Sequence, residues 1–150
     1  MYGSYPNSID MNGRCIIPAK FRDNLGQKCL LVKGFDPCIY LFSEKEFHDY
    51  VKRNIDSLPD EDDEAADLKF FFLSSICECK VDKQGRISIP EEWMNHAGID
   101  KEDNKEMVNV GFTDRIEIWS KKKHEERMKS VIATGPKKLR SKMQRYTPKP

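Results

Sequence analysis

The sequence has no long apolar run, few histidines and an odd number of cysteines, and each shortage excludes a class of protein. Its apolar stretches stay well below the ~20 consecutive residues that a membrane-spanning helix needs. Residues 1–5 lack the basic and apolar regions of a secretory signal. With five cysteines and no sign of secretion, we expect a cytoplasmic protein with reduced thiols rather than a disulfide framework.

Sequence motifs that carry catalysis are also missing. The sequence contains no Gly-x-Ser-x-Gly, no phosphate-cradling loop and no dinucleotide-binding fingerprint. Its three histidines, His48, His96 and His124, fall on predicted helices at unmatched places. Acidic residues are plentiful, but no repeated pairing indicates general acid–base catalysis. We therefore predict that the protein is not an enzyme and binds no cofactor.

Two cysteines, Cys77 and Cys79, stand two positions apart in a predicted strand, so their thiols face the same side. A zinc site would need two further ligands, and the remaining thiols are candidates only in principle: Cys15, Cys29 and Cys38. Small buried hydrophobic side chains explain the cysteines better, and we predict no metal site. A small metal- or thiol-dependent enzyme stays open as a third hypothesis.

What the sequence does contain is an internal repeat, whose clearest part is a turn. Residues 82–86 read Asp-Lys-Gln-Gly-Arg, and residues 10–14 read Asp-Met-Asn-Gly-Arg. Each pentapeptide runs into a short apolar strand that ends in a proline, Pro18 or Pro90. Aspartate favours turn starts and glycine supplies a positive φ, so both pentapeptides predict a tight turn between two strands.

The similarity extends to later parts of both copies. Residues 39–43 match residues 116–120 at an offset of 77 positions, whereas the turns match at an offset of 72. The second copy therefore has five extra residues, which we place in the polar run 100–106. Two matching blocks separated by a gap in a loop-like segment indicate a duplicated structural unit.

Each copy predicts the same order of elements: strand, turn, strand, short helix, strand, turn, strand. Pro6 confines the first strand to a sheet edge. The short helices start at a proline and end at a glycine, Gly26 or Gly98. A capping box at residues 43–46 starts a helix after the first copy. We therefore predict a mainly β fold with short helices, of the α+β class.

The same patterns divide the chain into segments. The repeats cover residues 5–47 and 76–119, a helical connector covers 48–75, a C-terminal helix covers 120–133, and a basic tail covers 134–150. We expect this tail to be disordered when free. It has no acid, and its basic residues are Lys137, Lys138, Arg140, Lys142, Arg145 and Lys149. A basic arm is common in nucleic-acid binders, although a solubilising end explains it equally well.

An arginine ends each pentapeptide, Arg14 in the first and Arg86 in the second. The planar guanidinium bonds O6 and N7 of guanine bidentately, and a two-stranded ribbon fits the major groove. We therefore predict base readout by these two arginines, against the alternative of two well-made turns with solvated arginines. The aspartates would repel phosphate, so we assign a turn-fixing role to Asp10, Gly13, Asp82 and Gly85.

Further cations flank the turns. We assign possible phosphate contacts to Lys20, Arg22, Lys80 and Lys83. Each of them is equally compatible with a solvated surface charge. The basic tail could add salt-sensitive attraction to a polyanion.

The run of apolar residues 70–73 lies on the predicted connector helix. Four large apolar side chains in a row cannot all face one core from a single helix, so we expect at least one to contact another subunit or the neighbouring helix. We assign a subunit-interface role to Phe70, Phe71 and Phe72. These residues also support an alternative function, an oligomeric scaffold that binds a protein partner through this helix.

Together, these motifs resemble the MraZ family of bacterial transcriptional regulators, which carry two SpoVT–AbrB repeats. The residues behind the resemblance lie in four segments, 8–22, 70–72, 82–90 and 115–120, within a match that covers residues 1 to 128. The resemblance implies a duplicated AbrB-like barrel of the swapped-hairpin or double-psi type. It also implies a ring-shaped homo-oligomer, associated with the nucleoid, that binds G-rich direct repeats in the promoter of the division and cell-wall gene cluster.

Two positions depart from the family pattern. The first turn has Asn12 where the family usually has lysine, and the second repeat has Met94 where arginine is common. Both changes concern peripheral phosphate contacts and leave the paired arginines in place. The leading hypothesis is therefore a sequence-specific, DNA-binding transcriptional regulator.

Overall fold

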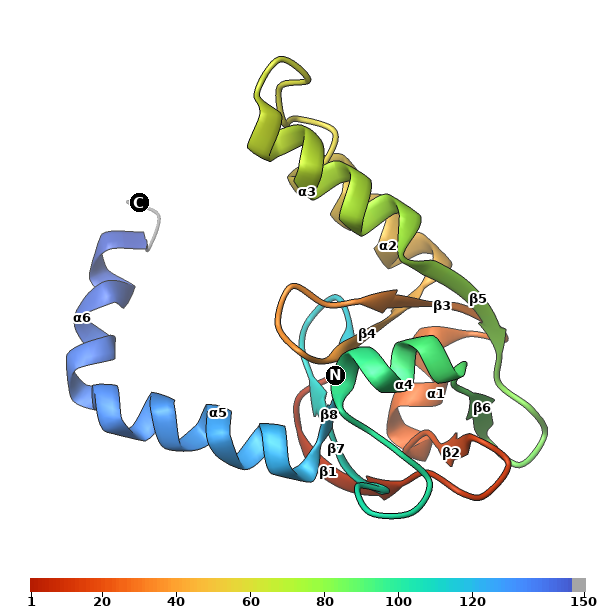
Figure 1. Cartoon of the computed structure of the whole chain (residues 1–150). Helices are drawn as coiled ribbons and strands as arrows, with labels where there is room; N and C mark the ends of the chain where they lie inside the picture. The colour runs from red at the N-terminus through yellow and green to blue at the C-terminus, as the bar shows by residue number, and fades with distance from the viewer. Residues whose placement is uncertain (147–150) are drawn as a thin grey trace.

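The computed structural model of the chain describes residues 1–146 and shows a β-rich α+β fold (Figure 1). The first repeat contains β1 (Gly3–Ser8), β2 (Arg14–Ile16), α1 (Ala19–Leu25), β3 (Lys28–Lys33) and β4 (Ile39–Ser43). The connector contains α2 (Glu44–Asn54) and α3 (Asp63–Ser74). The second repeat contains β5 (Ile76–Lys80), β6 (Arg86–Ser88), α4 (Glu91–Ala97), β7 (Glu106–Gly111) and β8 (Ile116–Ser120), followed by α5 (Lys121–Thr134) and α6 (Pro136–Tyr146). The predicted order of elements is confirmed in both repeats.

Six strands form one antiparallel sheet in the order β1-β7-β8-β4-β3-β5, while β2 and β6 form a separate two-stranded ribbon. Pro6 lies in β1 at one edge of the sheet, as its missing N–H requires. The two strands joined by each tight turn do not pair with each other: β1 pairs with β7, β5 pairs with β3, and β2 pairs with β6. The partners are exchanged between the repeats, which is the arrangement that a swapped hairpin implies.

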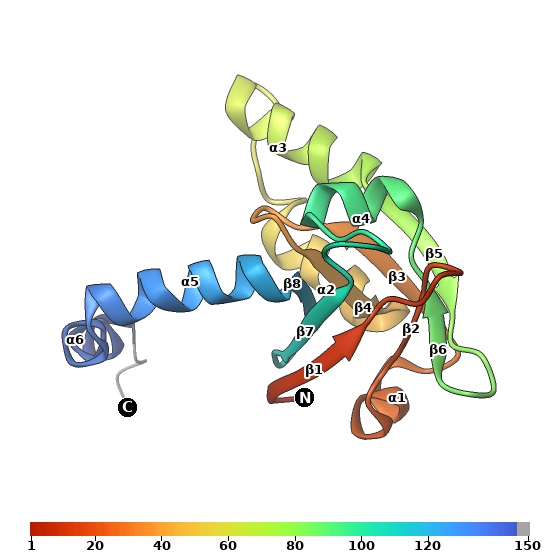
Figure 2. The same cartoon turned by 60° about the horizontal axis from the view of Figure 1, so that its bottom comes forward.

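The ribbon of β2 and β6 connects to both edges of the sheet. The chain runs from edge strand β1 through the first turn into β2, and from edge strand β5 through the second turn into β6 (Figures 1 and 2). Beyond the ladder, the Ile17 N–H donates to the carbonyl of Gly85 at 2.8 Å, and the Ile89 N–H donates to the carbonyl of Gly13 at 2.9 Å. Each strand end is thus bonded to the turn of the other repeat, and the two turns lie at opposite ends of one ribbon.

Two clusters of buried apolar side chains lie on opposite faces of the sheet. Because side chains alternate along a strand, β3 gives Cys29 and Leu31 to one cluster and Leu30 and Val32 to the other. The first cluster also takes side chains from the ribbon, α1 and α4. The second cluster packs under α2 and α3. The ribbon is therefore anchored on a core that both repeats share.

Serine caps start the helices that follow the repeats. Ser43 Oγ accepts the Glu46 N–H at 3.1 Å, as the capping box predicts, and Ser120 Oγ accepts the Lys123 N–H at 3.0 Å. The two capped helices continue differently: α2 runs beside α3, whereas α5 leads into α6 and extends away from the body (Figure 1). No helix within residues 1–146 is both long and apolar enough to cross a membrane.

Helix α6 differs from the disorder that we expect for residues 134–150. It covers Pro136–Tyr146, and residues 147–150 of the predicted tail lie outside the described residues. Lysine, leucine, arginine and methionine are strong helix formers, and Pro136 stands at the first helical position, where proline is tolerated. These residues account for the helical conformation of Pro136–Tyr146 in this structure, and the expectation for the free tail stays a prediction.

Candidate nucleic-acid interface

The two predicted turns have the same backbone geometry. In each turn, Oδ1 of the aspartate accepts the N–H groups of the residues two and four positions later, at 2.8 and 3.0 Å for Asp10 and at 2.9 and 2.8 Å for Asp82. The hydrogen bond from the Arg14 N–H is the largest reason that the pKa of Asp10 lies below its ordinary value. The bond from the Arg86 N–H does the same for the pKa of Asp82. Both carboxylates are therefore charged at neutral pH and hold their turns closed.

The ribbon puts the two predicted arginines on one face. Its register pairs Cys15 with Ile87, and both of these side chains are buried in the core. The neighbouring positions point the other way, and these include Arg14, Arg86 and the exposed Ile16. The arginines occupy diagonal positions of an antiparallel pair, where Cα atoms lie about 7–8 Å apart. The ribbon therefore carries both arginines on the strand face that points away from the core, and both side chains are half-buried.

The two arginines differ in what holds them. Nε of Arg86 donates to Oδ2 of Asp82 at 2.8 Å, and both side chains are about one third exposed. Nε of Arg14 is buried and has no hydrogen-bond partner among residues 1–146. Arg86 is therefore oriented by its own turn, whereas Arg14 is not.

Two of the predicted phosphate contacts lie beside the second turn. Arg22 of α1 donates from Nε to the carbonyl of Ile17 at 2.8 Å, and its guanidinium lies against Gly85. Lys83, within the turn, is exposed. Arg22, Lys83 and Asp82 line one shallow groove between α1 and the turn. The structure brings these two cations together.

The other two predicted phosphate contacts are placed differently. The Lys20 ammonium donates to the Tyr5 hydroxyl and lies 4.4 Å from the centre of that ring. Lys80 is exposed at the end of β5, opposite Lys28 of β3. Lys20 is thus engaged with the first strand of the sheet rather than with a turn.

The three phenylalanines of α3 have three different environments. Phe72 is fully buried in this chain, stacked on Tyr50 at a ring distance of 5.4 Å. Phe71 is half-buried, 6.2 Å from the ring of Phe35, and Phe70 is 78% exposed. Phe72 is therefore a core residue here, and the predicted subunit interface rests on Phe70 and part of Phe71.

The cysteines lie mostly inside the protein. Cys29 and Cys79 stand directly opposite each other on β3 and β5, with their Sγ atoms 2.9 Å apart, whereas Cys77 is half-buried. Burial raises the pKa of the Cys15 thiol to about 12 and raises that of Cys38 further. Such thiols are protonated and unreactive at neutral pH. Among residues 1–146, no three His, Cys, Asp or Glu side chains are grouped to hold a metal ion.

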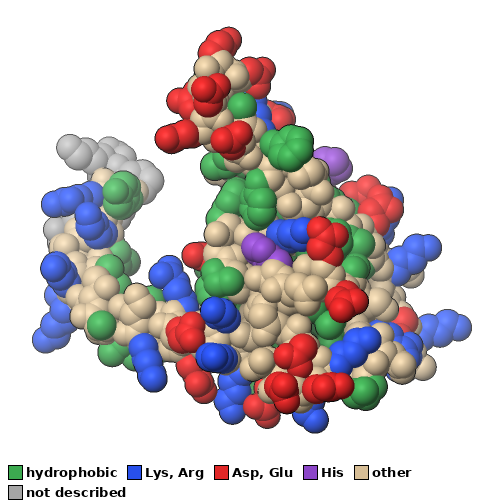
Figure 3. Space-filling model, in the orientation of Figure 1, with side chains coloured by type: hydrophobic (Ala, Val, Ile, Leu, Met, Phe, Trp, Pro, Cys, Tyr) green, Lys and Arg blue, Asp and Glu red, His purple; other side chains and the backbone are tan. Residues whose placement is uncertain are grey.

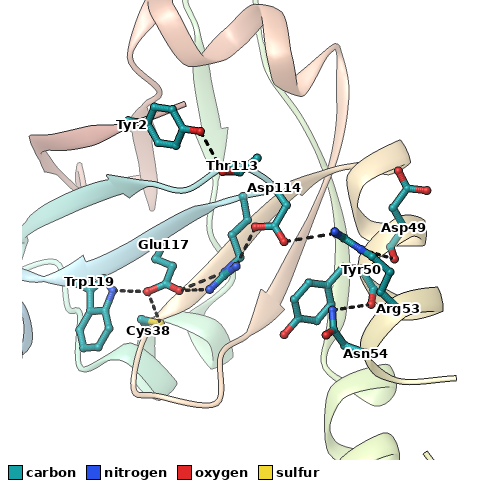
Figure 4. A network of polar contacts seen from close by, with 11 residues as sticks. Tyr2, Cys38, Asp49, Tyr50, Arg53, Asn54, Thr113, Asp114, Glu117 and Trp119 are labelled. Atoms are coloured by element: carbon teal, nitrogen blue, oxygen red, sulfur yellow. Dashed lines mark hydrogen bonds and ion pairs between the residues drawn. The ribbon is translucent and has the colours of Figure 1, made fainter. Parts of the chain in front are cut away.

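A polar network on β8 is one feature that the sequence reasoning missed (Figure 4). Arg115 donates to Asp114 at 2.8 Å and to Glu117 at 2.7 Å, and the buried Glu117 also accepts from the Trp119 indole N–H at 3.0 Å. Arg53 of α2 reaches Asp114 at 3.7 Å. The network ties the connector to the second repeat, and its signal in the sequence is the alternation Arg-x-Glu-x-Trp, which puts three polar groups on one strand face.

Charge is distributed unevenly over the surface. The space-filling view shows acidic side chains gathered at the free end of α2 and α3, and basic side chains along α6 (Figure 3). The basic residues of α6 are Lys137, Lys138, Arg140, Lys142 and Arg145. A second group of acidic side chains lies at the lower edge of the body in the same view, and the loop between α4 and β7 carries the exposed Glu102 and Asp103.

Comparison with known proteins agrees with the duplicated architecture. A family model described as "MraZ protein, putative antitoxin-like" matches the chain twice, over residues 1–71 and 72–143. A protein of Caldanaerobacter subterraneus subsp. tengcongensis, named "Transcriptional regulator MraZ", is 42% identical over 131 residues, which cover 87% of this chain and 88% of that protein. Proteins of the same name from Acetivibrio thermocellus and Clostridium tetani are each 40% identical over 124 residues, covering 83% of this chain and 83% and 84% of theirs. Two family matches that span the fold and relatives aligned over most of their length lead to one conclusion: the chain belongs to the MraZ family.

Proposed function

We propose that the protein is a transcriptional regulator that binds DNA through the solvent face of the β2–β6 ribbon. The name of its relatives, "Transcriptional regulator MraZ", supports the regulatory role. The single observation that carries the DNA-binding role is the location of Arg14 and Arg86 on one exposed face whose other side is anchored in the core. A two-stranded ribbon fits the major groove, so both guanidinium groups can reach base edges there.

The target that fits these groups is a run of guanines. Each guanidinium can bond O6 and N7 of one guanine, which favours G-rich direct repeats in the promoter of the division and cell-wall gene cluster. A ring-shaped homo-oligomer in the cytoplasm, at the nucleoid, would present one ribbon per subunit. Adjacent subunits would then read DNA repeats spaced by about 10 bp, and linked contacts would raise a weak single-subunit affinity.

A binding titration tests this function. The probe is a duplex carrying the repeats upstream of the protein's own gene, and the competitor is a duplex of the same composition in scrambled order. Arg14→Ala and Arg86→Ala should each reduce the preference for the repeat duplex by about 10- to 100-fold, the value of one bidentate contact. Arg140→Ala on α6 is the matched control and should keep the preference. If both ribbon variants bind the repeat duplex as the parent does, the proposal is wrong.

A second candidate function, a scaffold that binds a protein partner, is favoured by the exposed apolar end of α3. Phe70 is 78% exposed and Leu73 is 42% exposed on the same helix. Phe70→Ser should then remove partner binding or subunit assembly, visible in light scattering, and leave the affinity of each ribbon for DNA unchanged. Intact assembly and partner binding in this variant would count against the scaffold.

A further inference from the structure

Each turn glycine lies against the cationic end of a side chain from the other repeat. A Cβ added to Gly85 would overlap the guanidinium of Arg22, which belongs to α1 of the first repeat. A Cβ added to Gly13 would lie 3.6 Å from Cε and 3.9 Å from Nζ of Lys101, which belongs to the second repeat. The two turns are therefore flanked in a similar way, although Arg22 and Lys101 do not occupy equivalent positions in the sequence.

In the first repeat, the cation beside a turn glycine comes from helix α1. In the second repeat it comes from a loop, because the equivalent position of helix α4 is not basic. The position equivalent to Arg22, 72 residues later, is Met94, whose side chain is buried against the core. Lys101 comes instead from the segment between α4 and β7, where the second repeat has its five extra residues. This segment passes beside the N-terminal strands in Figure 1.

The loop that carries Lys101 has a defined shape. Oδ1 of Asp100 accepts the N–H groups of the residues two, three and four positions later, at 2.9, 2.6 and 3.2 Å. The Ile9 N–H, directly before the first turn, donates to the carbonyl of Lys105 at 2.9 Å. The loop is thus bent around one carboxylate and tethered to the strand that enters the turn, so Lys101 is held beside Gly13 by the fold.

The Lys101 ammonium is available to a ligand. The side chain is half-buried, and among residues 1–146 its ammonium takes part in no hydrogen bond and no ion pair. Lys101 shares a shallow hollow with four carboxylates, none of them in an ion pair with it: Asp100 accepts N–H groups of its own loop, and Glu91, Glu102 and Asp103 are exposed. Asp10 of the first turn accepts two backbone N–H groups. A half-buried ammonium that neutralises no carboxylate is suited to an anion.

Building on the proposed function, we propose that Lys101 binds a phosphate of the DNA backbone beside the first turn, the role that the sequence analysis assigns to Arg22 beside the second. The three-residue strands of the ribbon span about 7 Å between their end Cα atoms, at about 3.4 Å per residue. The major groove is about 12 Å wide. Cations at both ends of so short a ribbon meet the phosphates on the two sides of the groove, while Arg14 and Arg86 face the bases. Such contacts set the register of the ribbon without carrying sequence information.

The experiment measures affinity against salt concentration for the repeat duplex and the scrambled duplex. Lys101→Met keeps the aliphatic stem and removes the charge, whereas Lys101→Arg keeps the charge. We expect Lys101→Met to weaken binding of both duplexes equally, by about eightfold per engaged subunit at 0.1 M salt, and to lower the slope of log affinity against log salt by about 0.9 per engaged subunit. Lys101→Arg should retain both values. The control Lys105→Met, on the same loop, should change affinity by less than about twofold, because the Lys105 ammonium is not among the groups nearest Gly13.

The outcomes separate this inference from the function on which it rests. An unchanged salt slope in Lys101→Met, with a parent protein that still prefers the repeat duplex, overturns the phosphate role and leaves the function intact. Weakening confined to the repeat duplex also overturns it, because a phosphate contact acts on any sequence. A parent that binds both duplexes alike contradicts the function itself. Circular dichroism and thermal unfolding of each variant establish that it is folded as the parent is.

Discussion

The two repeats hold the same turn by different side-chain contacts. The backbone is shared, since the aspartate of each turn accepts the same two N–H groups. In the second turn, Asp82 also accepts Nε of Arg86 at 2.8 Å, and the guanidinium of Arg22 lies against Gly85. In the first turn, Nε of Arg14 is buried and has no hydrogen-bond partner in the described part of the chain.

Main-chain hydrogen bonds thus define the duplicated turn in both repeats, whereas the side-chain contacts of its arginine differ between them. Ordering a long side chain at an interface costs about 0.5–1.5 kcal/mol. Arg86 is held before binding by its bond with Asp82, whereas Nε of Arg14 is buried without a hydrogen bond that fixes its direction. We infer that the second turn is the more rigid reader and the first the more adaptable one.

The largest expected effect comes from filling the space beside the turn glycines. Gly13 and Gly85 both have a positive φ, +75° and +79°, so alanine strains either turn by about 1–2 kcal/mol. At Gly85 the new Cβ also displaces Arg22, whereas at Gly13 it meets only ordinary contacts. Gly85→Ala should therefore lower the free energy of unfolding by about 2–3 kcal/mol and Gly13→Ala by about 1–2 kcal/mol. Urea unfolding measures both losses. Equal losses of unfolding free energy would show that packing of Arg22 against Gly85 does not distinguish the two turns.

A second difference between the repeats lies in their shared core. Leu31 of β3 pairs with Leu41, and the corresponding position of β7 is Asn109, which pairs with Ile118. Asn109 is fully buried, and neither atom of its amide group has a hydrogen-bond partner among the described residues. Asn109→Leu should raise the free energy of unfolding by about 1–2 kcal/mol, because an unsatisfied buried amide is removed. The control is Leu31→Asn, which should destabilise the protein. A loss of stability in Asn109→Leu would show that the amide is satisfied.

The ion pair of the second turn can be removed without breaking the turn. Asparagine keeps an oxygen that accepts the two N–H groups but loses the charge that holds Arg86. Asp82→Asn should therefore weaken binding of the repeat duplex by about fivefold, the cost of ordering one released arginine. Asp10→Asn is the matched change, and its effect should be smaller, since Nε of Arg14 has no such bond to its turn aspartate. Equal losses in the two variants would show that both arginines are equally ordered before binding.

The smallest expected effect is a pH dependence of the free energy of unfolding, to which the aspartates of both turns contribute. The pKa values of Asp10 and Asp82 are lowered, in each case mainly by a backbone hydrogen bond from the arginine of the turn. A lowered pKa in the folded state means stability that is present above the ordinary value of 3.8 and is lost as the pH falls through the lowered one. Unfolding followed from neutral pH to below 3.8 should be less pH-dependent in Asp10→Asn/Asp82→Asn than in the parent. Parallel curves would mean that these carboxylates do not stabilise the fold.

The parts of the fold that the sequence predicts are those that depend on local chemistry. The positive φ of Gly13 and Gly85, the start of α2 at Ser43 and the edge position of Pro6 follow from residue type and spacing. The exchange of partners between the repeats does not, because a ladder such as Cys15 with Ile87 joins residues far apart in the chain. Local turn chemistry is the same whether a strand pairs with its neighbour or with its copy.

The candidate site likewise contains some residues that the sequence predicts and others that it does not. Arg14 and Arg86 are found from the repeat, since equivalent positions of a duplication reach equivalent places. Lys101 is not found, because it lies in the polar run 100–106 that contains the five extra residues, where the two copies cannot be aligned residue by residue. The separate environments of Phe70 and Phe72 depend on how α3 packs over the sheet, which a run of identical residues does not specify.

The ribbon also determines what a smaller version of this molecule could do. Since β2 and β6 come from different repeats, neither half of the chain contains a complete binding face. A fragment with only the first repeat would have to pair β2 with the β2 of a second copy, around a two-fold axis. The full chain is therefore equivalent to a covalently joined dimer of half-sized units, whose linkage lets the two arginines and their surroundings change independently.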